Sequence, residues 1–181
     1  MTVLLEARGL TRRFGGVLAL DRLDLSIAAN EIVGLIGPNG SGKTTFFNVL
    51  TGIYRADAGG ISFDGTDITR AAARTIYALG ISRTFQRSRL SLSLSIFDNI
   101  MIGNHKNLNQ GLWFNLIRRD AFRREFESGY AAARALIEVF EPALVERMFE
   151  PVAGLPMIDR RRIEICRALI SGTKLLLLDE P

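Results

Sequence analysis

The sequence has few of the residues that mark a secreted or disulfide-bonded protein, and no long apolar run. It contains one cysteine, Cys166, one histidine, His105, and one tryptophan among its 181 residues. A single cysteine cannot form an internal disulfide, which agrees with a reducing compartment. No apolar run approaches the ~18 residues of a membrane-spanning helix. The first eight residues lack the order of a signal peptide and are typical of a strand. We therefore expect a location on the cytosolic side.

Neither scarce residue is expected to carry chemistry. Cys166 shares one face of an expected helix with Ile163 and Ile170, which favours a buried core thiol over a reactive one. His105 lies in a polar stretch without another metal ligand at useful spacing. No metal site built on histidine or cysteine is therefore expected.

Positive charge is only slightly in excess over negative charge. The 23 Lys and Arg residues stand against 19 Asp and Glu residues, for a net charge of +4. Short basic clusters occur at 118–119, 123–124 and 160–162 without interleaved aromatic residues. This pattern favours solvated helix faces over a nucleic-acid site, so no nucleic-acid partner is expected. A docking surface for an anionic or membrane-side partner is the alternative.

A glycine-rich segment is the strongest signal present. It matches the phosphate-binding pattern G-x-x-x-x-G-K-[ST] at every fixed position, with Gly37, Pro38, Asn39, Gly40, Ser41, Gly42, Lys43 and Thr44. Glycines let such a P-loop turn its amides inward, and the following helix directs its positive end at the phosphates. Lys43 would reach the β and γ phosphates and Thr44 would coordinate Mg²⁺. The segment therefore predicts binding of a nucleoside triphosphate, ATP above all.

Two carboxylates close the sequence's last apolar run. Asp179 and Glu180 follow four leucines, 175–178, which are typical of a buried strand. Ligands of open α/β sheets lie at such strand ends. Asp179 is thus placed to hold Mg²⁺, and Glu180 to orient or deprotonate an attacking water. An apolar strand followed by Asp-Glu is weak evidence for such a site by itself, but it becomes strong evidence in a sequence that also has a P-loop.

The spacing of apolar residues and glycines predicts an α/β fold with a mixed sheet and helices. Strands are expected at 2–8, 17–26, 31–36, 61–65, from Ile81, and at 174–178. Helices are expected at 44–51 and from Thr69, as N-cap, to about Leu79 with Gly80 as its stop. From about residue 95 to 172 helical periodicity dominates, with apolar residues at helical spacing from Phe122 to Phe140. We predict one domain, residues 1–181, with a core of 1–94 and 173–181 and an inserted helical subdomain of about 95–172.

Along essentially its whole length the sequence resembles the ATP-binding subunits of ABC transporters. Residues 37–45, with Thr45 included, resemble their Walker A motif and 175–181 their Walker B motif; 82–90 resemble the Q-loop segment. The resemblance implies that Gln86 contacts Mg²⁺ or the water, with Lys43 and Glu180 as further catalytic residues. Phe14, in Arg-Phe-Gly-Gly at 13–16, would stack on adenine; a core Phe at a strand end is the alternative.

The finer resemblance is to the branched-chain amino acid uptake group, through 13–16, 83–86, 104–121 and 161–169. It implies transmembrane permease subunits and a second ATP-binding subunit as partners. It also implies a peripheral location on the cytoplasmic face of the plasma (inner) membrane.

The sequence departs from this group in two ways. Ile158 stands where the signature motif has a glycine, and its branched side chain would crowd the partner subunit's γ-phosphate. The sequence also ends directly after the Walker B carboxylates, so we expect that the C-terminal part of the core is missing. Two alternatives remain: a truncated nucleotide-binding module without useful turnover, and a soluble non-transport ABC-type ATPase.

Overall fold

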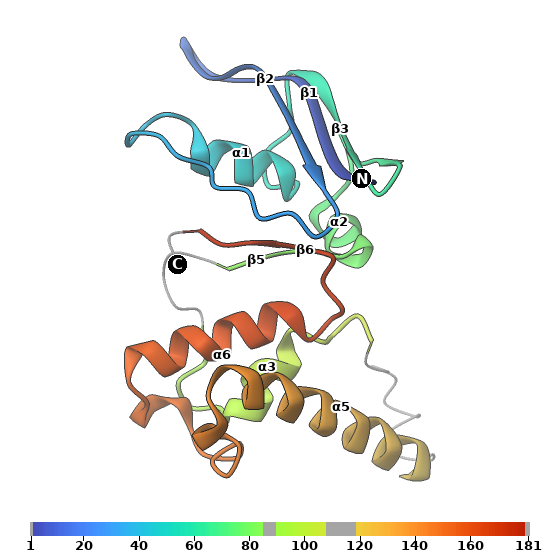
Figure 1. The fold of residues 1–181 in the computed structure, drawn as a ribbon, viewed down its shortest axis with the longest axis vertical. Helices are drawn as coiled ribbons and strands as arrows, with labels where there is room; N and C mark the ends of the chain where they lie inside the picture. Colours follow the sequence, from blue (N-terminus) through green and yellow to red (C-terminus); the bar gives the residue numbers. More distant parts are fainter. Residues whose placement is uncertain (1, 85–89, 108–118, 180–181) are drawn as a thin grey trace. The chain divides into compact units, whose positions relative to one another are not determined.

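The computed structural model describes residues 2–84, 90–107 and 119–179. These fall into two compact units, Met1–Leu79 and Gly80–Pro181, and each is described by itself. Figure 1 traces the chain through both units.

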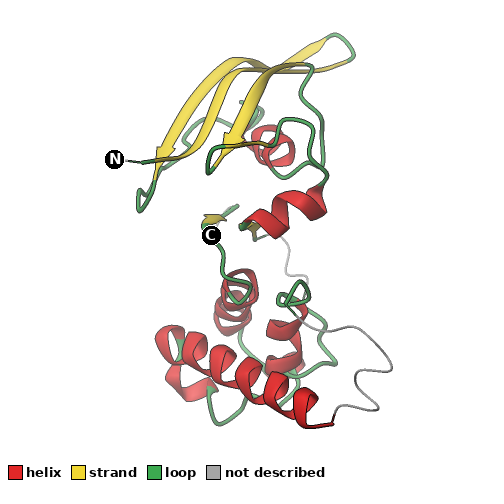
Figure 2. Cartoon of the chain, turned by 90° about the vertical axis from the view of Figure 1, so that its right-hand side faces the viewer, coloured by secondary structure: helices red, strands yellow, loops and turns green. Residues whose placement is uncertain are grey.

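The first unit is built on an antiparallel sheet of order β2-β1-β3-β4 (Figure 2). Its strands are β1 (Val3–Phe14), β2 (Val17–Ala28), β3 (Ala58–Phe63) and β4 (Thr66–Asp67). The strands predicted at 2–8, 17–26 and 61–65 are thereby confirmed. Leu5 and Leu10 are fully buried on β1. Gly15, at φ +56, forms the turn of the β1–β2 hairpin because that backbone conformation favours glycine.

Two helices complete this unit, α1 (Lys43–Leu50) and α2 (Ala73–Leu79). The predicted helix at 44–51 is confirmed, and it buries Phe46, Val49 and Leu50. The N-cap predicted at Thr69 is wrong, since α2 begins four residues later. The Thr69 hydroxyl instead accepts from the Ile61 amide at 2.9 Å and donates to Asp67 at 2.6 Å. The hydrogen bond from this hydroxyl is the largest of the interactions that lower the pKa of Asp67.

The apolar segment 31–36 is not the buried strand that its composition predicts. Residues 31–38 have no regular secondary structure, and Ile32 and Ile36 are 100% and 96% exposed. A strand exists only through hydrogen bonds to a neighbouring strand, and among the described residues none pairs with this segment. Apolar composition alone therefore misassigned it.

The second unit joins a short parallel strand pair to helices. Its elements are β5 (Ile81–Arg83), α3 (Ile96–Ile102), α5 (Arg119–Phe140), η1 (Pro142–Leu144), η2 (Val152–Gly154), α6 (Met157–Leu169) and β6 (Leu175–Leu177). Ile81 pairs with Leu175 and Arg83 with Leu177, so both strands predicted here are confirmed. The helical character predicted from residue 95 is also confirmed.

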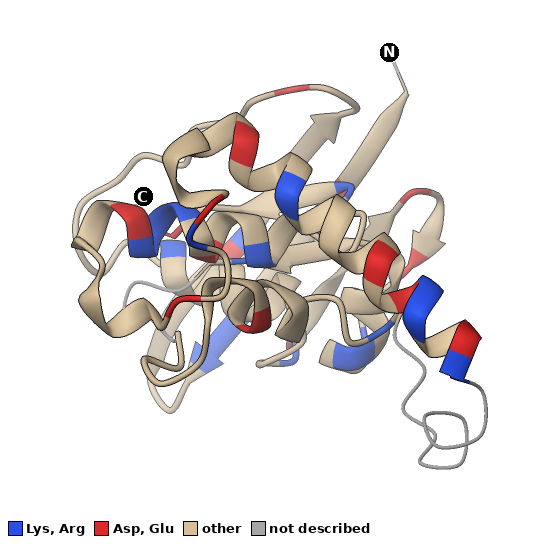
Figure 3. Ribbon diagram, turned by 90° about the horizontal axis from the view of Figure 1, so that it is seen from below, with Lys and Arg blue, Asp and Glu red and all other residues tan. Residues whose placement is uncertain are grey.

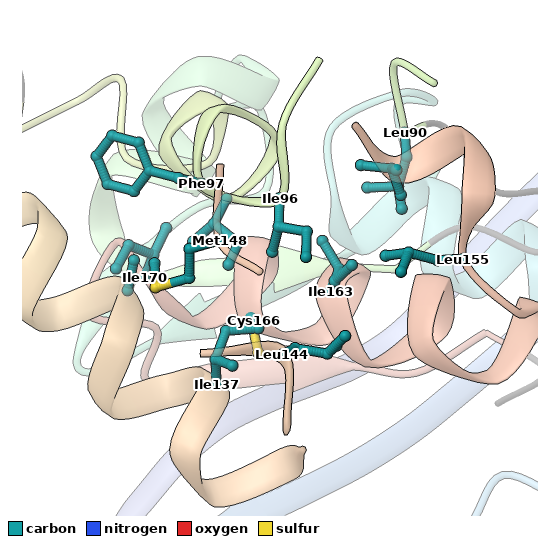
Figure 4. Close-up of a cluster of buried hydrophobic side chains, with 13 residues drawn as sticks. Leu90, Ile96, Phe97, Ile137, Leu144, Met148, Leu155, Ile163, Cys166 and Ile170 are labelled. Atoms are coloured by element: carbon teal, nitrogen blue, oxygen red, sulfur yellow. The ribbon is translucent and has the colours of Figure 1, made fainter. Parts of the chain in front are cut away.

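The core of this unit lies among α3, α5 and α6 (Figure 4). Ala133 and Ile137 are fully buried on α5, whereas Phe126 is 43% exposed. Cys166 is fully buried on α6, as predicted. Burial raises the pKa of its thiol to about 12, so the reactive thiolate is suppressed.

A buried asparagine ties the loop before α3 to that helix. The Asn99 side chain is fully buried. Its amide oxygen accepts from the Ser91 amide at 2.8 Å, and its amide nitrogen donates to the carbonyls of Ser91, Leu94 and Ser95 at 2.9–3.3 Å. One side chain therefore contacts four backbone groups of the segment 91–95, with two amide hydrogens shared among three carbonyls.

Charges of both signs are interspersed along the helices (Figure 3). Exposed pairs such as Arg123–Glu127 and Arg134–Glu138 follow helical i,i+4 spacing.

Within the described ranges, no helix combines the length and apolar character of a membrane span. The expected partition into a core of 1–94 and 173–181 and a helical subdomain of 95–172 stays a prediction.

Candidate nucleotide-binding site

The side chain of Lys43 contacts the backbone of the P-loop to which it belongs. The Lys43 ammonium donates to the Gly37 carbonyl at 2.6 Å and to the Pro38 carbonyl at 2.9 Å. The Ser41 amide donates to Pro38 at 3.2 Å and closes the turn. Phosphate oxygens are stronger acceptors for an ammonium than these carbonyls, so a bound triphosphate would compete with them for Lys43.

Two glycines are required by this loop for different reasons. Gly42 has φ +93, and a Cβ there would overlap the Ala19 carbonyl of β2. Gly40 has φ +84 but open space around it, so only its backbone conformation favours glycine. The loop is therefore packed directly against the hairpin β1–β2.

Helix α1 begins at the loop's last residues. The Phe46 amide donates to the Gly42 carbonyl at 2.8 Å, so the amides of Lys43, Thr44 and Thr45 precede the first intrahelical donor. No side chain caps this end. Thr44 is exposed and Thr45 half-buried. The helix thus presents amides, its positive end and a hydroxyl, the groups that an anion needs.

Phe14 ends β1 and is 38% exposed, so the alternative of a core Phe is wrong. Its ring lies edge-on to Tyr54, with centroids 5.2 Å apart, and the Arg12 guanidinium lies 4.6 Å above it. Sequence reasoning missed Arg12 and Tyr54. The two-residue spacing of Arg12 and Phe14, which places both on one face of a strand, was an available signal.

Asp179 lies just after β6 in a buried ion pair. Its carboxylate accepts from Arg83 of β5 at 2.6 Å, and the two side chains are 10% and 6% exposed. Its amide donates to the Thr84 hydroxyl at 3.4 Å. Arg83 was not predicted as a partner, although the parallel pairing of the two strands places them together. Gln86 and Glu180 lie outside the described residues.

The basic cluster 160–162 is not the solvated face that was predicted. All three arginines are partly buried. Arg161 donates to the nearly buried Glu164 at 3.1 Å and more weakly to the Asp179 carbonyl at 3.5 Å, and Arg162 pairs with Glu141 and Asp159. Glu164 and Asp159 lie three residues from their arginines on α6, a helical spacing that the sequence itself offered. Glu141, in contrast, is brought beside Arg162 by packing.

The donors at Thr44 and Asp179 suit Mg²⁺ chemically. Magnesium takes hydroxyl and carboxylate oxygens and usually only one or two protein side chains beside substrate phosphates. The described part of the chain holds no group of three or more His, Cys, Asp and Glu residues that could hold a metal ion. Asp179 would have to exchange its Arg83 contact for the ion.

The loop, its lysine and the α/β elements define a P-loop nucleotide-binding protein. The sequence model of the ABC transporter family matches residues 20–181. The chain belongs to that family, which confirms the resemblance.

Curated relatives agree. The chain is 37% identical over 178 residues to the high-affinity branched-chain amino acid transport ATP-binding protein LivG of Salmonella typhimurium, covering 98% of this chain and 69% of LivG. It is 39% identical to BraF of Pseudomonas aeruginosa, named for the same transport, with the same coverage. A ribose import ATP-binding protein of Rubrobacter xylanophilus is 36% identical over the whole chain but only 34% of its own length.

Solved structures give the same fold. A nucleotide-free ATP-binding cassette from an ABC transporter matches with a TM-score of 0.80 at 29% identity, over 99% of this chain and 70% of that one. The ADP conformation of an ATP-binding cassette matches with a TM-score of 0.79 at 27% identity, over 97% and 68%. The predicted fold class is thereby confirmed as that of ABC ATPase cassettes.

Proposed function

We propose that this chain is an ATP-binding, ATP-hydrolysing subunit of an importer for branched-chain or related amino acids. The observation that carries nucleotide binding is the P-loop held by Lys43 against α1. The solute is supported by LivG and BraF, whose names specify branched-chain amino acid transport. The proposal includes transmembrane permease subunits, a second ATP-binding subunit, and a peripheral place on the cytoplasmic face of the plasma membrane.

The proposed roles follow the chemistry of each group. Lys43 and the amides at the start of α1 bind the β and γ phosphates, and Phe14 stacks on adenine. Gln86 and Glu180 position and deprotonate the attacking water. Thr44, Asp179 and Gln86 would hold Mg²⁺, which neutralises charge on the phosphates when bound. Turnover would then be coupled to movement of the permease subunits.

Binding is tested by titrating the chain with a fluorescent ATP analogue in magnesium buffer. Lys43→Ala should weaken binding by about 10- to 100-fold, the range for losing a hydrogen bond to a charged group. Lys106→Ala is the matched control and should change the affinity less than about 2-fold, because it removes the same charge from outside the P-loop. Equal affinities for both variants would contradict the phosphate site.

Hydrolysis is tested separately by phosphate release. Glu180→Gln and Gln86→Ala should each lower turnover at least about 100-fold while ATP binding persists, because proton transfer and water positioning contribute at that scale. Turnover that is independent of both residues would overturn the assigned roles. Binding without any release in the unmodified chain would favour the module without turnover.

Ile158 is the observation that favours that second function. It lies in the first turn of α6 and is 60% exposed, so its branched side chain is available to crowd a partner subunit. Ile158→Gly should raise turnover if the residue obstructs a shared site. Met157→Gly, the neighbouring change at 70% exposure, controls for loosening of the helix end.

The solute is tested by uptake in cells that lack the gene. Loss of labelled leucine uptake, restored by the gene and not by its Lys43→Ala form, is expected. Loss of ribose uptake instead would favour the function named for the ribose import relative.

A further inference from the structure

An arginine and a tyrosine surround the predicted adenine-stacking residue. Arg12 precedes Phe14 by two positions on β1, so their side chains leave the same face of the strand. The Arg12 guanidinium lies 4.6 Å from the Phe14 centroid and 5.8 Å from that of Tyr54. The two rings meet at 73°. Such a cation over aromatic faces is an attractive arrangement.

Arg12 is held in this place by Asp57. The guanidinium donates to one carboxylate oxygen of Asp57 at 3.0 Å, and the Arg13 amide donates to the other at 2.7 Å. The Asp57 amide donates in turn to the Thr11 carbonyl at 2.9 Å. Asp57 is thus fixed to β1 at three successive residues, and the Arg12 side chain is only 22% exposed. The guanidinium therefore cannot leave the ring without breaking a bridged network.

This cluster adjoins the P-loop through the hairpin. Phe14 pairs with Val17 across the turn. Two residues further along β2, the Ala19 carbonyl is so close to Gly42 that a Cβ there would overlap it. The aromatic cluster is thus attached to the strand that supports the phosphate site, on the same compact unit.

We propose that Arg12 is a positioning residue for recognition of a purine base, resting on the proposed nucleotide function. The guanidinium covers one face of the Phe14 ring, Tyr54 abuts it, and the uncovered face receives the base. Arg12 never touches the nucleotide in this arrangement. It fixes the rotamer of Phe14, so that the ring is in place before the ligand arrives.

The experiment compares two ligands, ATP and inorganic tripolyphosphate, by calorimetry on the full chain. Tripolyphosphate has no base or sugar, so the ratio of the two affinities isolates the contribution beyond the phosphates. Arg12→Met keeps an unbranched stem but removes the planar cation. It should weaken ATP binding about 2- to 5-fold, the scale of one exposed cation–π contact converted to affinity, and leave tripolyphosphate binding unchanged.

Arg8→Met is the matched control, because it removes the same charge from the same strand. Its side chain is 77% exposed and pairs with Glu6, so the affinity ratio should not change. Phe14→Ala should bring the affinity for ATP close to that for tripolyphosphate. Adding Arg12→Met to Phe14→Ala should not lower the ATP affinity further. Asp57→Asn, which weakens the anchor of Arg12, should lower the ratio by a smaller factor.

The inference is overturned if Arg12→Met and Asp57→Asn leave the ratio unchanged, or if Arg12→Met weakens both ligands equally. The latter pattern would assign Arg12 to long-range attraction of phosphate. Failure of the unmodified chain to bind either ligand would overturn the proposed function itself. Equal affinity for ATP and tripolyphosphate would spare the phosphate site but overturn base stacking and, with it, the role of Arg12.

Discussion

Lys43 in the first unit and Asp179 in the second are both predicted to act on a magnesium-bound triphosphate, yet the fold holds them in opposite ways. Lys43 is bonded to two carbonyls of a surface loop, whereas Asp179 is closed into an ion pair with a side chain only 6% exposed. Carbonyl contacts at a surface can be exchanged for a ligand at little cost. A buried carboxylate has to retain a compensating cation. The first unit therefore presents groups that suit an anion, whereas in the second unit the Arg83 cation already compensates the Asp179 charge.

The largest expected effect tests the buried ion pair. Arg83→Met should lower the free energy of unfolding by about 3–5 kcal/mol, because it leaves the Asp179 charge buried and uncompensated. Arg123→Met, which breaks the exposed pair with Glu127, should cost at most about 0.5 kcal/mol. Denaturant titration of both variants measures the difference. Similar small losses would mean that Asp179 is accessible, and the contrast with Lys43 would disappear.

The next effect compares apolar side chains of the two units. Ile137→Ala removes a fully buried side chain and should cost about 2–5 kcal/mol. Ile36→Ala, at a site 96% exposed, should change the stability by less than about 0.5 kcal/mol. Urea unfolding followed by circular dichroism measures both. A large loss at Ile36 would mean that segment 31–36 is packed, as its composition predicted.

A smaller effect tests the close approach of α3 and α6. A Cβ on Gly103 would overlap the Arg167 carbonyl, so Gly103→Ala should cost about 1–3 kcal/mol through helix displacement. Gly154 has open space around it and no positive φ, so Gly154→Ala should be nearly neutral. Thermal unfolding distinguishes them, and equal melting temperatures would show that the helices yield easily.

The effect that is smallest near neutral pH is the pH dependence from Cys166, because it develops only above about pH 9. Its pKa is raised from 9.0 to about 12 in the folded chain, so folding favours the neutral thiol. The associated stability is present below about pH 9 and is lost toward pH 12, at up to about 1.4 kcal/mol per pH unit. Iodoacetamide should therefore label Cys166 at pH 9 only in denaturant. Rapid labelling of the folded chain would show that the core opens readily.

Sequence reasoning was most successful where a pattern is local. The P-loop, the strands at 2–8 and 17–26, helix α1 and the burial of Cys166 all follow from residue spacing within a few turns. It failed where a partner decides the outcome. Segment 31–36 has the composition of a strand but no neighbour among the described residues to pair with, and Arg162 has an acidic partner, Glu141, that packing of the chain provides.

The residues of the candidate nucleotide-binding site divide in the same way, into those set by local spacing and those set by a distant partner. Lys43 and Thr44 were assigned from spacing alone, and their positions at the loop and helix start agree with it. Arg83 was missed because its relation to Asp179 depends on the register of β5 against β6. Arg12 was missed because its role depends on Asp57, which is 45 residues away.

The four hydrogen bonds of Asn99 also have a consequence for slow dynamics. Because they join the segment 91–95 to the first turns of α3, this loop and the helix must open as one cooperative unit. The Ser91 amide should then exchange with deuterium at the rate of the helix, although it lies in a loop. A loop amide that exchanges in this way belongs to the same cooperative opening unit as the helix.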